Sequence, residues 1–336
     1  MAHTLKLHIW KVLLKPSMTK QKDVPNEMLL NRIKAINGTE SGDPYIAFAK
    51  GYIESFNGRF AKNRKRTKSF APIVEKIYTK SNQNLIYGFL QGGPTGIEQY
   101  IKPNSDYKRD STDVGVDDVV NLDYYFHFWI PADTNYAYIM LQSYSEVNRG
   151  IAGPFFEHLH EFLGKYGYIM RGKEPKVPKP IKEMFMEESV IIGMDIIKDR
   201  TSPADRKRFN QALHESEKAK FKLSVSGISM PFSWFQKHFK MSKRGNPFFI
   251  DLSELGITDP NDYIANVRYR DPITNTSTQA KLSDLLNIRP TIVLPESVKK
   301  KGSEYPDLDK VFVFCNQQLQ MLLLEEKYAT VDEYQG

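Results

Sequence analysis

Residues 122–164 read LDYYFHFWIPADTNYAYIMLQSYSEVNRGIAGPFFEHLHEFLG, and the predicted fold is built around this stretch. Aromatic residues and isoleucine fill 124–130, and apolar residues alternate over 136–145, as is typical of β-strands. The intervening PADTN is rich in turn-forming residues. Neither strand carries a charged residue. Because a half-exposed strand normally has some, we predict a central hairpin that is covered on both faces and buries Phe128 and Leu141.

The hairpin leads through a glycine-containing turn into an amphipathic helix that ends near Gly164. Pro154 suits the first turn of that helix, where its missing N–H has no partner to lose. Backbone N–H groups and the helix dipole favour an anion at such a turn, and a basic side chain adds positive charge. Arg149, Gly150 and Gly153 are therefore a candidate anion-binding site. The alternative is that both glycines serve only the geometry of the turn.

The chain has 336 residues, of which 40% are hydrophobic and 12% aromatic, so it can bury a sizeable core. Its helix and strand patterns predict an α+β fold, with a mixed or antiparallel sheet whose central hairpin is packed by helices. After Lys220 shorter strands replace the longer elements. We therefore predict an α+β domain over 1–220 and a smaller α+β domain over 221–336 that ends in an apolar helix. The proline-rich stretch at 166–182 is an alternative boundary.

Local patterns predict further elements on both sides of the hairpin. Gly51 would weaken a helix over 45–56, so we predict a strand there, followed by a turn at Asn57-Gly58. We also predict a short helix over 70–79 and, over 85–101, a second hairpin whose turn is the glycine-rich stretch 92–96. The remaining predictions are strands over 5–14, 221–226, 248–252 and 291–294, a hairpin over 263–270 and 276–282, helices over 25–36, 181–194, 202–220, 231–239 and 308–327, a polar loop over 104–118 and an extended connector over 166–182.

The sharpest functional signal is the segment 59–68, which we call the basic loop. It contains six basic residues and no acid: Arg59, Lys62, Arg64, Lys65, Arg66 and Lys68. The chain as a whole has a net charge of +7, yet residues 223–336 hold 13 Lys/Arg against 14 Asp/Glu, so the excess lies upstream. Such a concentration of positive charge can contact the phosphates of a nucleic-acid backbone. A solubilising surface loop is the alternative interpretation.

Three functions from different classes fit these patterns. The first is a nucleic-acid-binding protein, for DNA or RNA, that contacts the backbone without strong sequence readout. The second is a scaffold or regulatory subunit that forms a homo-oligomer or binds a protein partner through the broad apolar face of 308–327. The third is an enzyme that binds a phosphorylated ligand at the 149–154 turn. No residue argues for a particular pathway, antiviral defence included.

Other kinds of site lack support in the sequence. Cys315 is the only cysteine, and His158 and His160 would point to nearly opposite sides of one helix, so no zinc site is expected. The acidic residues between 106 and 123 lack the spacing of a calcium loop, and we interpret them as solvated. We therefore predict no metal and no cofactor, and we assign no catalytic residue. A single cysteine favours a reducing compartment such as the cytoplasm, and the lack of a run of ~18 apolar residues predicts no membrane partner.

Overall fold

The computed structural model describes residues 3–18, 23–38, 40, 42–101, 110–145, 150–198, 221–234, 264–272, 275, 277–281 and 290–328. The chain forms two compact units: Met1–Pro178 with Thr291–Gly336, which we call the sheet unit, and Lys179–Pro290, the second unit. The structure therefore differs from the predicted boundary at Lys220. It divides the chain within the proline-rich stretch and again before the last strand, because the last helix packs on the large sheet.

The sheet unit has an α+β fold, as the sequence predicts. Its elements are β1 (Leu5–Pro16), α1 (Asn26–Asn37), α2 (Pro44–Glu54), β2 (Ala61–Lys62), β3 (Lys68–Lys80), η1 (Ser81–Gln83), β4 (Leu85–Pro94), β5 (Gln99–Ile101), β6 (Thr112–Val114), β7 (Leu122–Trp129), β8 (Tyr136–Tyr144), α3 (Ala152–Lys165), β9 (Tyr168–Lys176), β14 (Ile292–Val293), η6 (Glu296–Val298) and α7 (Leu308–Glu325). The large sheet is antiparallel, with the order β14-β1-β8-β7-β4-β3-β2, and β9 also pairs with β1. β5 and β6 form a separate two-stranded ribbon.

The predicted central hairpin is confirmed. β7 and β8 lie in the middle of the sheet, and their register pairs Phe126 with Leu141 and Phe128 with Ile139. Only 3% of Phe128 and 1% of Leu141 are exposed. The charge-free pattern of the two strands therefore does mark a hairpin that is covered on both faces.

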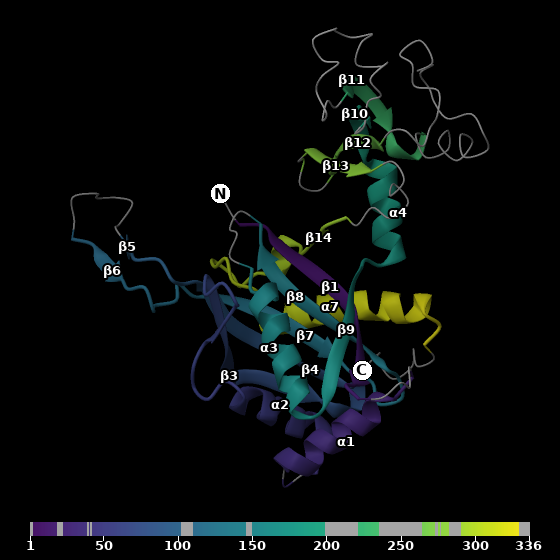
Figure 1. Ribbon diagram of the computed structural model, residues 1–336. Helices are drawn as coiled ribbons and strands as arrows, with labels where there is room; N and C mark the ends of the chain where they lie inside the picture. Colours follow the sequence, from purple (N-terminus) through teal and green to yellow (C-terminus); the bar gives the residue numbers. More distant parts are fainter. Residues whose placement is uncertain are drawn as a thin grey trace, which may run out of the picture. The chain divides into compact units, whose positions relative to one another are not determined.

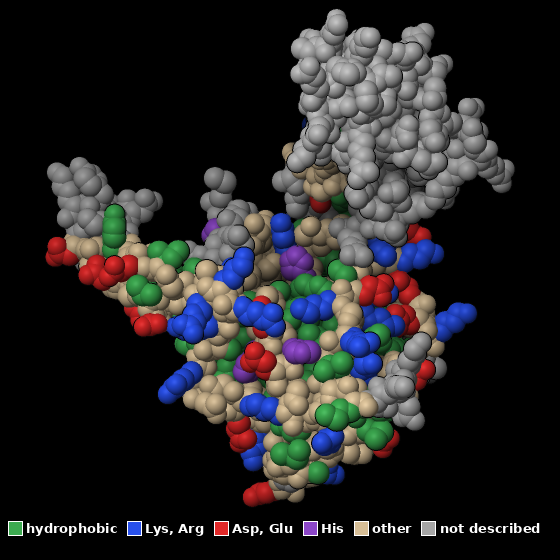
Figure 2. All heavy atoms as spheres, viewed as in Figure 1, with side chains coloured by type: hydrophobic (Ala, Val, Ile, Leu, Met, Phe, Trp, Pro, Cys, Tyr) green, Lys and Arg blue, Asp and Glu red, His purple; other side chains and the backbone are tan. Residues whose placement is uncertain are grey.

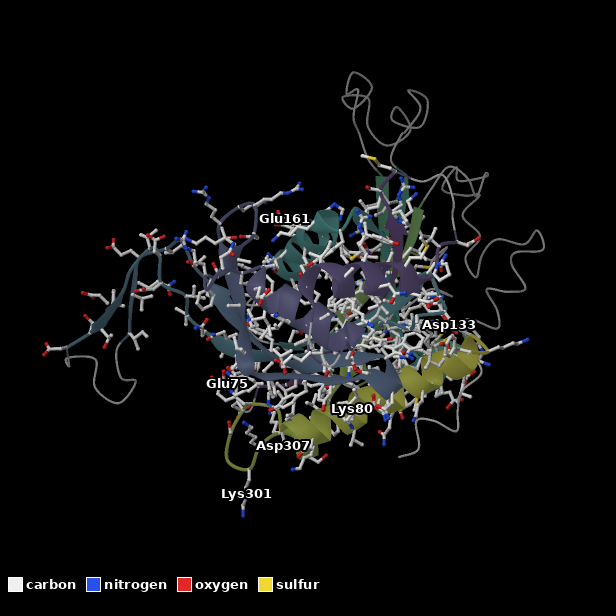
Figure 3. The ribbon with its side chains drawn as sticks, turned by 90° about the horizontal axis from the view of Figure 1, so that it is seen from below. Glu75, Lys80, Asp133, Glu161, Lys301 and Asp307 are labelled. Atoms are coloured by element: carbon white, nitrogen blue, oxygen red, sulfur yellow. The ribbon has the colours of Figure 1, made fainter. Side chains whose placement is uncertain are left out.

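Different helices cover the two faces of this hairpin, because successive side chains of a strand point to opposite sides. Phe128 faces α2, where its ring centroid lies 5.5 Å from that of Phe48. The neighbouring His127 faces the other way, with its ring 5.7 Å from Phe312 of α7. Figures 1 and 3 show α7 on the opposite side of the sheet from α2 and α3. The core of the sheet unit is therefore a helix–sheet–helix sandwich.

The last helix, α7, is capped by Asp307, whose carboxylate accepts a hydrogen bond from the backbone N–H of Lys310 at 3.3 Å. Its apolar side is buried within the unit, at Val311, Cys315, Leu319, Leu322 and Leu323. This accounts for most of the broad apolar face seen in the sequence. The predicted contact of this helix with a second chain stays a prediction.

The predicted strand over 45–56 is wrong, because this segment is helix α2. Asp43 caps it: its Oδ1 accepts hydrogen bonds from the backbone N–H groups of Tyr45, at 2.7 Å, and Ile46, at 3.2 Å, and Pro44 follows at the first helical position. Gly51 is present for close packing. A Cβ at this position would lie 1.9 Å from Asn37 Nδ2.

The predictions for 70–79 and 85–101 are also wrong. The first segment is the strand β3 instead of a helix, and Pro72 lies where the register of β3 with β4 shifts, so its missing N–H interrupts the pairing there. β4 pairs with β3 and β7 instead of folding back on 97–101. Gly93 forms no hairpin turn but lets another segment approach, since a Cβ there would lie 2.0 Å from Val120 O.

The connector 166–182 is extended as predicted over β9, but it pairs with β1 and is part of the sheet. The second unit then comprises α4 (Lys179–Glu188), β10 (Val190–Lys198), β11 (Phe221–Pro231), β12 (Ile264–Arg270) and β13 (Ser277–Lys281), with the sheet order β11-β10-β12-β13. The predicted hairpin of β12 with β13 is confirmed. The predicted helix over 202–220 and strand over 248–252 lie outside the described residues.

Candidate nucleic-acid interface

The basic loop is a tight, hydrogen-bonded hairpin between β2 and β3 rather than a loose loop. Asn63 organises it: its Oδ1 accepts hydrogen bonds from the backbone N–H groups of Thr67, at 2.8 Å, and Lys68, at 3.0 Å. Its own N–H donates to Lys68 O at 2.9 Å, and Arg66 N–H donates to Asn63 O at 2.8 Å. Arg66 has a φ of 53°, so its backbone adopts the left-handed conformation that suits a tight turn. The cations are therefore carried on an ordered backbone.

Several contacts attach this hairpin to the rest of the sheet unit, among them a hydrogen bond from the backbone N–H of Thr95 to Thr67 O at 3.1 Å. Glu157 of α3 accepts a hydrogen bond from the backbone N–H of Arg64 at 2.9 Å, and Lys68 Nζ donates to Gly150 O at 3.2 Å. Lys62 forms an ion pair with Asp117 at 3.1 Å, which is exposed and so contributes little. The exposed basic residues of the loop are Arg59, Lys62, Arg64, Lys65 and Arg66, and Lys68 is half-buried.

A pocket of about 710 Å³ lies beside the hairpin, where the N-terminus of α3 meets strands β1 and β8. We call it the α3 pocket. Its described lining residues are Lys6, His8, Trp10, Lys68, Leu141, Gln142, Ser143, Tyr144, Ser145, Gly150, Ile151, Ala152 and Gly153. The structure thus brings Lys68 of the basic loop together with Gly150 and Gly153 of the predicted anion-binding turn. Arg149, the third residue of that prediction, lies outside the described residues.

Two aromatic rings of β1 form one wall of the α3 pocket. His8 and Trp10 lie nearly parallel, with ring centroids 5.7 Å apart and planes inclined by 25°. Trp10 packs edge to face against Phe156 of α3, with ring centroids 5.1 Å apart, and His8 Nε2 lies 3.0 Å from Ser143 Oγ. His8 is exposed at the pocket surface, yet the surrounding walls desolvate its ring enough to lower its pKa, and the charge of Lys6 lowers it further, which favours the neutral ring.

Sequence reasoning missed His8 and Trp10, although the signal was present. In strand 5–14 the apolar residues Leu5, Leu7 and Ile9 alternate with Lys6, His8 and Trp10. Such alternation predicts one core-facing side and one side that carries charge and aromatic surface. The sequence alone does not reveal that β1 pairs with β8, and this pairing places the side that carries His8 and Trp10 against the start of α3.

Positive charge is spread over this face of the sheet unit. Figure 2, viewed as Figure 1, shows Lys and Arg side chains across the face on which α3 and β1 lie, with His and apolar side chains among them. Lys173 of β9 adds positive charge to this face, since its Nζ lies 4.3 Å from the ring centroid of Phe156. The arrangement can bind an anion and offer aromatic surface at the same place.

A second pocket, of about 240 Å³, contains a serine–histidine pair beside the basic loop. His158 Nε2 lies 2.8 Å from Ser55 Oγ, and Ser55 Oγ donates its proton to Tyr52 O at 2.6 Å. His158 must then act as the donor, so it cannot remove the hydroxyl proton. Burial, and secondly the charge of Lys165, lower the pKa of His158 to about 4. The pair therefore stabilises the packing of α2 against α3 and is not arranged as an activated nucleophile.

Within the described residues no group of three or more His, Cys, Asp or Glu side chains is placed to hold a metal ion. The helices in the described part of the chain include none that is both long and apolar enough to span a bilayer. No protein-family model, no curated protein and no solved structure matches the chain.

Proposed function

We propose that the protein binds nucleic acid, DNA or RNA, through phosphate contacts made by the basic loop. The observation that carries this proposal is the ordered hairpin on which Arg59, Arg64, Lys65 and Arg66 are exposed together. Because Asn63 and Glu157 fix the backbone of the turn that carries Arg64, Lys65 and Arg66, less conformational freedom is lost when these side chains meet phosphates. Contacts to phosphate oxygens carry no base information, so binding is expected to vary little with sequence.

The α3 pocket adds a reason to prefer this function over a merely solubilising loop. A solubilising loop needs no neighbouring concave surface, whereas here Lys68 connects the loop to a pocket with a second lysine, Lys6, and with exposed aromatic surface. Positive grooves lined with aromatic rings are typical of proteins that bind single strands. The scaffold alternative has less support, because α7 buries most of its apolar face within its own unit.

The proposal is tested with a charge-matched pair of variants. The first replaces Arg64, Lys65 and Arg66 by alanine. The control replaces three exposed lysines by alanine: Lys300 and Lys301, which precede α7, and Lys310 in its first turn. Both variants therefore lose three positive charges from the sheet unit.

Fluorescence anisotropy with two labelled duplexes of unrelated sequence, at low salt, measures the affinities. We expect the loop variant to bind both duplexes at least tenfold more weakly than wild type, and the control to change affinity by roughly twofold or less. Equal losses in both variants would show that only total charge matters. No binding by the wild type would remove the proposal altogether.

A further inference from the structure

The α3 pocket combines two lysines, Lys6 and Lys68, with the aromatic rings of His8 and Trp10. Phosphate contacts alone need only the lysines, so the rings indicate a ligand that also has a flat, aromatic part. We infer that the pocket holds one unpaired nucleotide of a single strand, with the base against His8 and Trp10 and the phosphate toward Lys6 and Lys68. This inference rests on the proposed function, because the strand reaches the pocket from the basic loop.

The base end of the pocket is argued from the two rings. His8 and Trp10 lie in line along β1 with nearly parallel planes, and His8 is exposed at the pocket surface. Phe156 fixes the Trp10 ring from the side, so the aromatic surface is held in place before any ligand binds. Every nucleobase has a flat face that can stack on such a surface, which makes the contact tolerant of sequence.

The phosphate end is argued from the turn that precedes α3. Ile151, the residue that precedes the first turn of α3, makes no side-chain cap, and Ile151, Ala152 and Gly153 all line the pocket, so the backbone donors of this helix start belong to its wall. An added Cβ at Gly150 or Gly153 would meet no atom within 4 Å, so both glycines border open space. Lys68 Nζ is already held at this turn by Gly150 O, at 3.2 Å. The lysine and the backbone donors therefore lie on the same side of the pocket.

The size of the pocket selects an unpaired nucleotide. A volume of about 710 Å³ lies within the usual range of pockets for small molecules and is too small for a base pair with its two backbones. A base inside a duplex is stacked on both sides and cannot reach a ring in a pocket without leaving the helix. Single strands should therefore bind more tightly than duplexes of the same length.

The experiment uses the full chain and three probes: an oligothymidylate of about twelve nucleotides, a duplex of the same length, and thymidine monophosphate. The intrinsic fluorescence of Trp10 reports stacking, and a Trp10→Phe variant identifies its share of the signal, since Trp129 is buried and Trp234 belongs to the second unit. Two further variants alter the pocket with little risk to folding: His8→Ala, at an exposed position, and Gly153→Ala, which meets no atom. Gly164→Ala, at the other end of α3 and equally open, is the control.

We expect the oligothymidylate to quench the fluorescence of wild type but not of Trp10→Phe. His8→Ala and Gly153→Ala should each bind it about tenfold more weakly, the usual size of one lost stack or one displaced phosphate contact, while duplex binding and the Gly164→Ala control stay unchanged. Equal affinity for strand and duplex, with both pocket variants unaffected, would overturn the inference and leave the basic loop untouched. Quenching by thymidine monophosphate alone would overturn it as well, because the pocket would then take a free nucleotide. Loss of duplex binding in the loop variant reports on the proposed function separately.

Discussion

Gly51 in the middle of α2 decides how closely the helices of the sheet unit approach, and Gly51→Ala should reverse the usual effect of this substitution. An alanine in place of glycine normally stabilises a helix by up to about 1 kcal/mol. Here a Cβ would lie 1.9 Å from Asn37 Nδ2 and 3.1 Å from Tyr166 OH. The Asn37 side chain must therefore move.

The cost of that movement follows from the bonds of Asn37. Its Nδ2 donates to Tyr166 OH at 2.6 Å and to Ala47 O at 3.4 Å, and these bonds connect α1, α2 and the end of α3. Each lost hydrogen bond costs about 0.5–1.5 kcal/mol, and overpacking adds roughly 1–3 kcal/mol. With both bonds lost, and after subtracting the gain of about 1 kcal/mol in helix propensity, we expect Gly51→Ala to lower the free energy of unfolding by about 1–5 kcal/mol.

Urea unfolding followed by the fluorescence of the buried Trp129 measures this change in the sheet unit. Gly164→Ala in α3 is the matched control, because its Cβ meets no atom within 4 Å, and it should leave the midpoint unchanged or raise it slightly. If Gly51→Ala stabilises the protein as Gly164→Ala does, the close contact between α2 and Asn37 does not exist in solution.

Two further predictions concern the core and its pH dependence. Phe128→Ala should lower the free energy of unfolding in urea by about 3–5 kcal/mol, because removing a buried aromatic side chain leaves a cavity. The control Val74→Ala, at a position that is 57% exposed, should change stability little. Equal midpoints for the two variants would place the hairpin outside the core. Burial alone would raise the pKa of Glu326, but the hydrogen bonds from Lys11 Nζ, at 2.7 Å, together with the positive charge of this lysine, outweigh it and hold the pKa below its usual value. Because the pKa of Glu326 is lowered in the folded state, its contribution to stability is present above about pH 4.5 and is lost as the pH falls through the folded-state pKa. Glu326→Gln should therefore flatten the decline in the free energy of unfolding below about pH 4.5. An unchanged pH profile would contradict this ion pair.

The hairpin β7–β8 and helix α3 could be predicted from the sequence because their signals are local and strong. Charge-free alternation marks a strand that is covered on both sides, and Phe155, Leu159 and Phe162 recur at helical spacing. The buried face of α7 could be recognised in the same way. Its location could not, because a helix pattern does not say which surface the helix covers.

The wrong predictions for 45–56 and 85–101 have a common physical cause. Gly51 and Gly93 indicate a break in the local structure when only the neighbouring residues are considered, whereas in the fold each glycine lets another segment approach closely. Such a contact involves a residue far along the chain, so local propensity cannot reveal it. The α3 pocket was missed for the same reason: Lys68 and Gly150 are 82 residues apart, and only the fold brings them within 3.2 Å.

The measurement that tests the central claim most directly is the salt dependence of nucleic-acid affinity. On duplex DNA each phosphate neutralised by the protein contributes about −0.9 to the slope of log affinity against log salt concentration. The basic loop exposes Arg59, Arg64, Lys65 and Arg66, so we expect a steep slope for wild type. Replacing Arg64, Lys65 and Arg66 by alanine should flatten this slope by roughly two to three units, with little change in stability. An identical slope in the wild type and this variant, or no binding by the wild type at low salt, would contradict the account.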